Sequence, residues 1–133
     1  MDLPFTFTVV ADEDRMDFLP THCGKVFPFF ERAVFDFARA FCTAYKGGYW
    51  QFYECSNGAF FMAPDSDESF RIFVSGNGFE GVLSAKAFGI TLTLFALNYL
   101  AARDRAMAEK YDLLKDFLVA VPDESGLIRR AID

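Results

Sequence analysis

Histidine, cysteine and basic charge are scarce in this sequence. Its 133 residues include one histidine and three cysteines, and 13 Lys and Arg face 19 Asp and Glu, which gives a formal net charge of -6. A single histidine excludes a histidine-rich zinc site, and Cys23, Cys42 and Cys55 are spaced neither like a disulfide framework nor like paired zinc ligands. The acidic balance has the wrong sign for a general phosphate-binding surface, so we do not expect free nucleic acid as the main ligand.

Long apolar runs are also absent. The longest stretch without formal charge, residues 87–102, contains glycine, threonine and asparagine. It is shorter than the ~20 apolar residues that a membrane-spanning helix needs, so we interpret it as a buried helix. The first twelve residues have two acids, no base and no apolar block, and therefore lack the pattern of a secretory signal. We expect a cytoplasmic protein without membrane contact.

Apolar and aromatic residues, in contrast, are abundant. They make up 53% and 18% of the chain, which excludes disorder for most of it. A chain of this length fits one core, and no linker, repeat or low-complexity tract divides it. We expect a single domain over residues 1–133.

Two helices are expected in the first third of the chain. Acidic residues followed by a proline predict a short helix over residues 12–19, with Asp12 as its N-cap and Pro20 as its end. Apolar residues at alternating spacings of three and four predict a second helix over residues 26–45. The glycine pair at residues 47–48 should end it.

The middle of the chain has the pattern of two β-hairpins. Asn57-Gly58 and Asn77-Gly78 each lie between segments rich in aromatic and β-branched residues, and such Asn-Gly pairs favour two-residue hairpin turns. We therefore predict a four-stranded antiparallel meander. Its strands are expected at residues 49–55, 59–63, 70–75 and 79–84.

Two-residue turns would also set the register. In the second hairpin they place Ile72 opposite Leu83 and Val74 opposite Gly81. In the first hairpin one face would carry Trp50, Phe52 and Phe61, and the other Tyr53, Phe60 and Met62. Because both faces carry large side chains, either helices cover both sides or one aromatic patch faces a partner.

Three further helices are expected after the hairpins. Residues 86–101 are apolar nearly all round, which predicts a central helix packed on the sheet. Residues 107–121 have an amphipathic pattern, residues 125–132 suit a last short helix, and a break is expected near residues 103–105. The predicted fold class is α+β, a four-stranded antiparallel meander packed with N-terminal and C-terminal helices.

Two places in the sequence have residues of the types that carry chemistry. His22 and Cys23 are adjacent, but a nucleophile–base pair or a metal site needs further partners, so we interpret both as structural residues. Asp65, Asp67 and Glu68 form an acidic loop that lacks the length and ligand series of a calcium hand. Solvated acids are the expected interpretation, with a divalent-cation site as the alternative.

Residues 45–65, YKGGYWQFYECSNGAFFMAPD, strongly resemble the signature of the ArdB/KlcA type of antirestriction proteins. The resemblance extends over nearly the whole chain, through Arg15 and His22, the segment SGNGFEG at residues 75–81, and the closing residues 131–133. It implies a small cytoplasmic protein, carried on mobile elements such as plasmids and phages, that relieves type I restriction of incoming unmodified DNA. It further implies no catalysis, no cofactor and a mechanism other than extended DNA mimicry.

The partner implied by this resemblance is the type I restriction-modification complex or its DNA-translocating subunit. Five residues in the resembling segments are candidates for interaction: Trp50, Arg15, Glu31, Asp65 and Asp67. Trp50 offers a large contact area and one donor, but it can instead fill the layer beneath a helix. Arg15 and Glu31 can serve a partner or pair with each other, whereas Asp65 and Asp67 suit contact with a basic subunit.

Two other classes of function stay open. A weak, nonspecific DNA-associated protein would bind any duplex with steep salt dependence, through Arg103, Arg105, Lys110 and Lys115. An enzyme would instead depend on His22 and Cys23. The oligomeric state is also open, because an exposed aromatic face would permit a dimer without requiring one.

Overall fold

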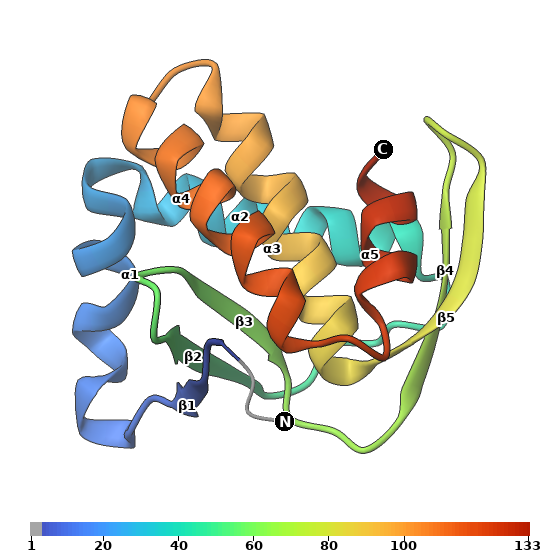
Figure 1. The fold of residues 1–133 in the computed structure, drawn as a ribbon, viewed down its shortest axis with the longest axis horizontal. Coiled ribbons are helices and arrows are strands. Elements are labelled where there is room, and N and C mark those ends of the chain that lie inside the picture. The colour runs from blue at the N-terminus through green and yellow to red at the C-terminus, as the bar shows by residue number, and fades with distance from the viewer. Residues whose placement is uncertain (1–3) are drawn as a thin grey trace.

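A buried helix at the centre organises the fold. The computed structural model describes residues 4–133, and α3 (Ala85–Ala101) lies between the other helices and the strands (Figure 1). Ser84 begins this helix, since its side-chain oxygen accepts a hydrogen bond from the Ala87 amide at 3.1 Å. Even Thr91 and Thr93 are fully buried, and their hydroxyls are satisfied by Ala87 O and Met62 N. The central apolar helix expected from the sequence is confirmed.

In the part of the chain that the structure describes, five strands form two separate antiparallel sheets. One contains β1 (Phe7–Val9), β2 (Trp50–Cys55) and β3 (Phe60–Pro64) in that order, and the other pairs β4 (Ser69–Val74) with β5 (Phe79–Ser84). The α+β class is confirmed, but the single four-stranded meander is wrong, because β3 and β4 do not pair. Strand β1 was missed, since its three residues form no pattern of their own and depend on pairing with β2.

The first hairpin turn is one residue longer than expected. Glu54 pairs with Phe60, and the Cys55 amide donates to Ala59 O, so residues 56–58 form the loop. Asn57 accepts from the Ala59 amide and donates to Leu113 O at 2.8 Å, so this turn is fixed partly by α4 (Arg105–Phe117). The extra residue shifts the register by one, so the side chains of one strand lie on the opposite face from the one expected. The predicted faces are therefore wrong: one face carries Trp50, Phe52, Phe60 and Met62, and the other carries Tyr53 and Phe61.

The second hairpin turn is two residues longer than expected. Val74 pairs with Phe79 across a loop of residues 75–78, which places Ile72 opposite Gly81 rather than Leu83. Asn77 again accepts within the loop, from the Phe79 amide, and donates to Ala131 O of the C-terminal helix. A shift of two residues keeps each side chain on its expected face, so the apolar face of this hairpin survives the wrong register.

The first helix continues through its proline. A 3-10 turn (η1, Asp12–Asp14) leads into α1 (Arg15–Cys23), which contains Pro20, and no side chain caps it. The predicted Asp12 cap and Pro20 stop are therefore wrong. Proline removes one backbone hydrogen bond, and the burial of Phe18 and Leu19 beside it outweighs that loss. The helix ends instead at Gly24, whose φ of 57° suits a glycine.

The other helices lie close to their predicted positions. After a 3-10 turn (η2, Gly24–Val26), α2 spans Phe27–Phe41, so it ends before the predicted residue 45 and the glycine pair. Asp104 separates α3 from α4 (Arg105–Phe117) by accepting hydrogen bonds from the Ala106 and Met107 amides. A 3-10 turn (η3, Leu118–Ala120) and α5 (Ser125–Ile132) complete the chain.

Other parts of the protein cover both faces of the aromatic hairpin. On one face the Phe52 ring stacks on Phe18 of α1, with centroids 5.2 Å apart, and Phe60 packs against Phe30 of α2. On the other face Phe61 packs edge-on against Phe7 of β1 and contacts Phe117 of α4. The two-sided covering is thus the correct alternative.

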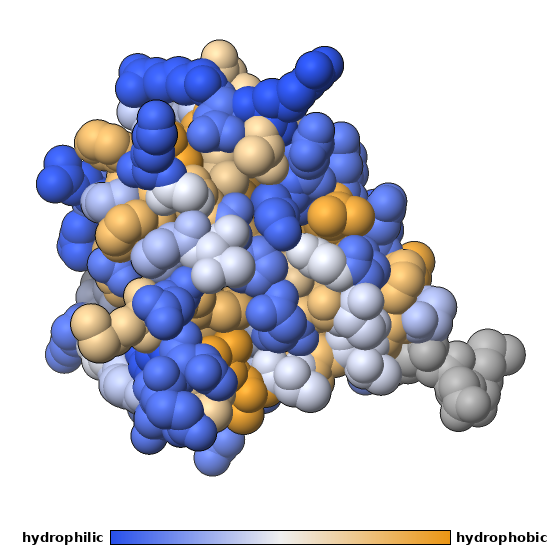
Figure 2. All heavy atoms as spheres, turned by 90° about the vertical axis from the view of Figure 1, so that its left-hand side faces the viewer, coloured by the Kyte–Doolittle hydropathy of each residue, from blue (hydrophilic) through white to orange (hydrophobic). Residues whose placement is uncertain are grey.

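The outer surface is mostly hydrophilic on the side of α1. Figure 2 shows this side, where hydrophilic side chains predominate and hydrophobic ones form separate small areas. Among residues 4–133, no helix is long and apolar enough to cross a membrane. The three cysteines are free and buried, as expected from their number and spacing.

The contact between Gly89 and β3 gives the first prediction. A Cβ added at Gly89 of α3 would overlap Ala63 Cβ and Met62 O of β3, and the overlap with backbone cannot relax by a side-chain rotation. We predict that Gly89→Ala lowers the free energy of unfolding by about 1–3 kcal/mol, measured by urea denaturation. Gly126→Ala in α5 is the control: it meets no atom within 4 Å, and alanine favours a helix, so it should be neutral or stabilise by about 0.5 kcal/mol. Equal stability of both variants would contradict this packing.

Candidate functional site

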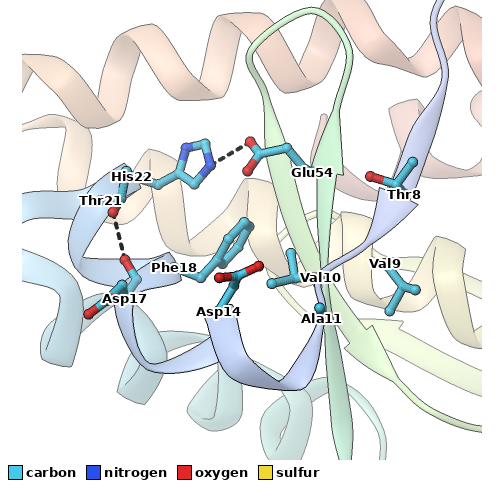
Figure 3. Close-up of a pocket in the computed structure, with 10 residues that line it drawn as sticks. All are labelled: Thr8, Val9, Val10, Ala11, Asp14, Asp17, Phe18, Thr21, His22 and Glu54. Carbon is cyan, nitrogen blue, oxygen red and sulfur yellow. Dashed lines mark hydrogen bonds and ion pairs between the residues drawn. The ribbon is translucent and has the colours of Figure 1, made fainter.

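An open hollow lies where β1, η1, α1 and β2 meet. Its volume is about 520 Å³, and Figure 3 shows its lining side chains. Asp14, Asp17 and Glu54 contribute three carboxylates, whereas none of the lining residues is Lys or Arg. His22 and Glu54 point toward one another at its edge. The hollow is therefore a candidate binding site for a positively charged group.

The single histidine is held by two charged partners. Its Nε2 lies 2.7 Å from Glu54 Oε1, and its Nδ1 lies 2.9 Å from Lys110 Nζ. Lys110 can only donate, so Nδ1 accepts and the proton belongs on Nε2, which donates to Glu54. Lys110 also donates to Gly58 O at 3.1 Å. Through Glu54 and Lys110, the His22 side chain thus connects α1 with β2, α4 and the first hairpin turn.

Burial keeps this histidine neutral. Its side chain is 8% exposed, and its ring stacks on Phe60 at 4.5 Å and meets the Phe18 ring edge-on. Burial lowers the pKa of His22 below its usual value of 6.5, the positive charge of Lys110 lowers it further, and Glu54 opposes both. The neutral ring fits the donor and acceptor roles of its two nitrogens.

The thiol beside it is not activated. Cys23 is 3% exposed, and burial raises its pKa to about 12. A nucleophilic cysteine needs a lowered pKa and an adjacent base, and both nitrogens of His22 already have other partners. The His22–Cys23 pair therefore lacks the features of a catalytic pair, in agreement with the structural interpretation.

Arg15 is a second polar link between α1 and β2. Its Nη2 donates to Trp50 O at 2.9 Å and its Nη1 to Gln51 Oε1 at 3.4 Å. The guanidinium also lies over the rings of Tyr49 and Phe52, 4.7 and 4.5 Å from their centroids. Glu31 lines the same small hollow of about 280 Å³, but within residues 4–133 no ion pair joins it to Arg15. Of the two alternatives for Arg15 and Glu31, the mutual pair is therefore wrong.

Trp50 is a core residue in this structure. It is 4% exposed, its Nε1 donates to the Tyr45 hydroxyl at 3.0 Å, and its ring packs against Phe35 and Phe88. It therefore fills the layer between β2 and the helices, which was the structural alternative for this residue, and offers almost no surface to a partner.

The acidic loop between β3 and β4 is exposed. Both Asp65 and Asp67 face solvent, and the Asp65 amide donates to Tyr49 O. Asp65 and Glu68 line a small hollow of about 200 Å³, which is distinct from the one that Arg15 and Glu31 share. In the described part of the chain, no group of three or more His, Cys, Asp or Glu side chains is arranged to hold a metal ion. The five candidate residues do not converge on one site.

Sequence reasoning did not identify the partners of His22. Glu54 lies 32 positions away and Lys110 lies 88 positions away, each within an ordinary amphipathic pattern. The sequence instead places Lys110 among the four cations of a possible DNA-binding surface. No local signal identifies such a contact, because it forms only when α1 and α4 pack on the same hairpin.

Comparisons with known proteins identify relatives along the whole chain. A family described as "Antirestriction protein" matches residues 43–133. Two proteins of Escherichia coli named antirestriction protein KlcA are 43% and 45% identical, over 99% and 98% of this chain and 97% and 94% of their own length. An uncharacterized protein, YafX of strain K12, is 36% identical over 96% of this chain and 88% of its own length.

A solved structure has the same fold. It aligns with a TM-score of 0.89 at 43% identity and covers 100% of this chain and 98% of its own. The structure comes from a study of the KlcA and ArdB proteins. That study describes a novel fold, and antirestriction activity of these proteins against type I DNA restriction systems in vivo but not in vitro.

The histidine network gives the second prediction. Because the pKa of His22 is lower in the folded protein than the unfolded value of about 6.5, the unfolded chain binds more protons below that pH. The free energy of unfolding should therefore be larger at pH 7.5 and fall as the pH drops toward 5. A His22→Gln variant should lose this part of the pH dependence.

NMR titration of the one histidine checks the cause directly. Lys110→Met should raise the pKa of His22 and Glu54→Gln should lower it, because these charges act in opposite directions. A His22 pKa at or above 6.5 in the folded protein, or shifts of the same sign in both variants, would contradict the network.

Proposed function

The chain belongs to the antirestriction protein family, and from this premise we propose that it relieves type I restriction of unmodified DNA in the bacterial cytoplasm by binding, without catalysis. The observation that carries the proposal is the likeness to the KlcA and ArdB structure over the whole chain. The same fold at this identity preserves the arrangement of surface elements as well as the core.

The activity described for KlcA and ArdB in vivo but not in vitro favours a particular kind of mechanism. A protein that blocked the purified restriction enzyme by itself would act in both settings. We infer that this chain needs a component or state of the cell as well as the type I complex, and that it acts on the complex while DNA is being translocated.

Binding, rather than chemistry, is supported by the candidate site. The Cys23 thiol is protonated at neutral pH and His22 is occupied by Glu54 and Lys110, so the pair has no free base or thiolate.

Charge also argues against imitation of DNA. A globule of this length is roughly 36 Å across, and B-DNA of that length carries ~20 phosphate charges. A net charge of -6 is far smaller.

Two local acidic surfaces support contact with a basic, DNA-translocating subunit. One is the loop with Asp65 and Asp67, and the other is the hollow with Asp14, Asp17 and Glu54. A DNA motor presents basic side chains where it tracks phosphates, and such side chains are complementary to these carboxylates.

Weak DNA association is the second candidate function. It is less favoured because Lys110, one of its four proposed cations, already contacts His22 and Gly58.

The third prediction concerns the activity itself. Unmodified phage should plate more efficiently on cells that have an active type I system when those cells produce this protein. An empty vector and an isogenic strain without restriction are the controls, and the increase should be confined to the restricting strain. No increase despite folded, soluble protein would contradict the proposal, and an equal increase in both strains would indicate an effect unrelated to restriction.

The fourth prediction separates the acidic surfaces from charge in general. Asp65→Asn with Asp67→Asn should reduce antirestriction about three- to tenfold, the size expected from losing two exposed ion pairs. The matched control is Asp112→Asn with Asp116→Asn, which removes two exposed carboxylates from α4 and should leave activity unchanged. If both pairs reduce activity equally, total charge rather than this loop is responsible.

Binding to labelled duplex at low salt, measured by gel retardation, tests the DNA-associated alternative.

A further inference from the structure

An apolar groove lies between α2 and the end of α3, outside the acidic surfaces. Its volume is about 450 Å³. Phe29 of α2 and Tyr99 of α3 line it and are each 57% exposed, while Ala33 and Leu100 beside them are buried. The Tyr99 ring packs edge-on against Phe37 at 6.3 Å, which holds it in place. Two large exposed aromatic side chains in one concave surface are typical of a binding site rather than of scattered surface residues.

The charge of this groove is opposite to that of the whole protein. Arg32 and Arg103 line it, both are exposed, and within residues 4–133 neither forms a hydrogen bond or ion pair through its side chain. The one acid in the lining, Asp36, is already paired with Arg39. Two free cations therefore remain beside the apolar surface, on a protein whose net charge is -6.

The N-terminus of α2 and the C-terminus of α3 both border the groove. Val26 lines the groove and precedes the first turn of α2, which has no side-chain cap and no acidic residue. The partial positive charge of the α2 N-terminus is offset by the partial negative charge of the α3 C-terminus, so the two arginines supply the positive charge of the groove. These charges match an occupant that is acidic as well as apolar.

We propose that this α2–α3 groove binds an acidic amphipathic helix of a second protein. An apolar side chain of that helix lies between Phe29 and Tyr99, and its carboxylates contact Arg32 and Arg103. The lining residues Val26 to Phe37 span about 17 Å along α2, which accommodates roughly three turns of a partner helix. The inference rests on the proposed function and gives the chemistry of a partner beyond the basic subunit.

Other occupants fit the groove less well. Single-stranded nucleic acid uses aromatic rings and arginines, but it also needs a continuous basic path along several phosphates, and here two cations border a mainly apolar surface. A second copy of this chain offers one acidic helix, α1, but that helix exposes a single large apolar side chain, Met16, instead of the apolar stripe that the groove needs. The apolar faces of α4 and α5, with Met107, Leu114 and Ile128, are buried in its own core.

A second partner also agrees with the cellular requirement described for KlcA and ArdB, whose activity appears in vivo but not in vitro. A protein that contacts a basic subunit through its acidic surfaces can use the groove to engage another cellular protein at the same time. Simultaneous engagement raises the effective concentration of each contact.

The first experiment uses the plating assay with charge reversal. Arg32→Glu with Arg103→Glu should reduce antirestriction at least about tenfold, because like charges facing each other across an interface are strongly unfavourable. Lys86→Glu with Arg130→Glu makes the same change in net charge at exposed positions outside the groove and outside the acidic surfaces, and should retain activity. Circular dichroism and thermal unfolding should show that both double variants fold, since all four side chains are exposed. Full activity of the groove variant, with the wild type active, would overturn the proposal.

The second experiment measures binding without relying on antirestriction. The probe is a fluorescein-labelled helical peptide of about 14 residues with leucines at i, i+3, i+4 and i+7 and glutamates beside them. It should bind the wild-type protein more tightly than its lysine-for-glutamate counterpart or an oligodeoxythymidine. Arg32→Glu with Arg103→Glu, and separately Phe29→Ser, should weaken that binding.

The outcomes distinguish the two proposals. A wild-type protein that fails to relieve restriction but binds the acidic peptide contradicts the proposed function and supports the groove. Tighter binding of the oligonucleotide, or of the basic peptide, overturns the groove assignment. A wild-type dimer that becomes a monomer on Phe29→Ser, measured by sedimentation, also overturns it, because a second copy would then be the occupant.

Discussion

The contact between α3 and β3 at Gly89 is the constraint on which the rest of the structure depends. There the helix backbone lies directly against Ala63 and Met62, with no space for a side chain. The Met62 amide donates to the Thr93 hydroxyl one turn further along, so a polar contact fixes the same approach. Because every residue of β3 is buried, this close packing places the aromatic hairpin inside the protein, and α1, α2 and α4 then pack around it.

Polar residues of the segments that resemble the family mainly hold elements together. Arg15 connects α1 to β2 through the Trp50 carbonyl and two aromatic rings, and His22 connects α1 to β2 and α4 through Glu54 and Lys110. In a core built largely from aromatic rings, apolar contacts tolerate many orientations, whereas hydrogen bonds to defined atoms tolerate few. These residues thus determine how the helices sit on the hairpin, which is enough to explain their presence without chemistry.

The charges that are left for partners are distributed unevenly. The acidic loop and the acidic hollow are separate from the α2–α3 groove, where Arg32 and Arg103 have no partner within the described residues. Two surfaces of opposite sign suit a protein that connects two partners, and this agrees with the activity in vivo but not in vitro that is described for KlcA and ArdB. In the proposed function the fold serves as a rigid support that holds these surfaces apart.

The sequence by itself determined the helices, the hairpins and the family, because periodicity, Asn-Gly turns and the signature at residues 45–65 are local properties. It also indicated that His22 and Cys23 are structural. Only the tertiary structure decided the hairpin registers, since Asn57 and Asn77 bond to α4 and α5 and thereby select longer loops. It likewise separated the two sheets, buried Trp50, and paired His22 with Glu54 and Lys110. The physical reason is the same in each case: these features depend on groups distant in sequence, and their energies exist only once the core has formed.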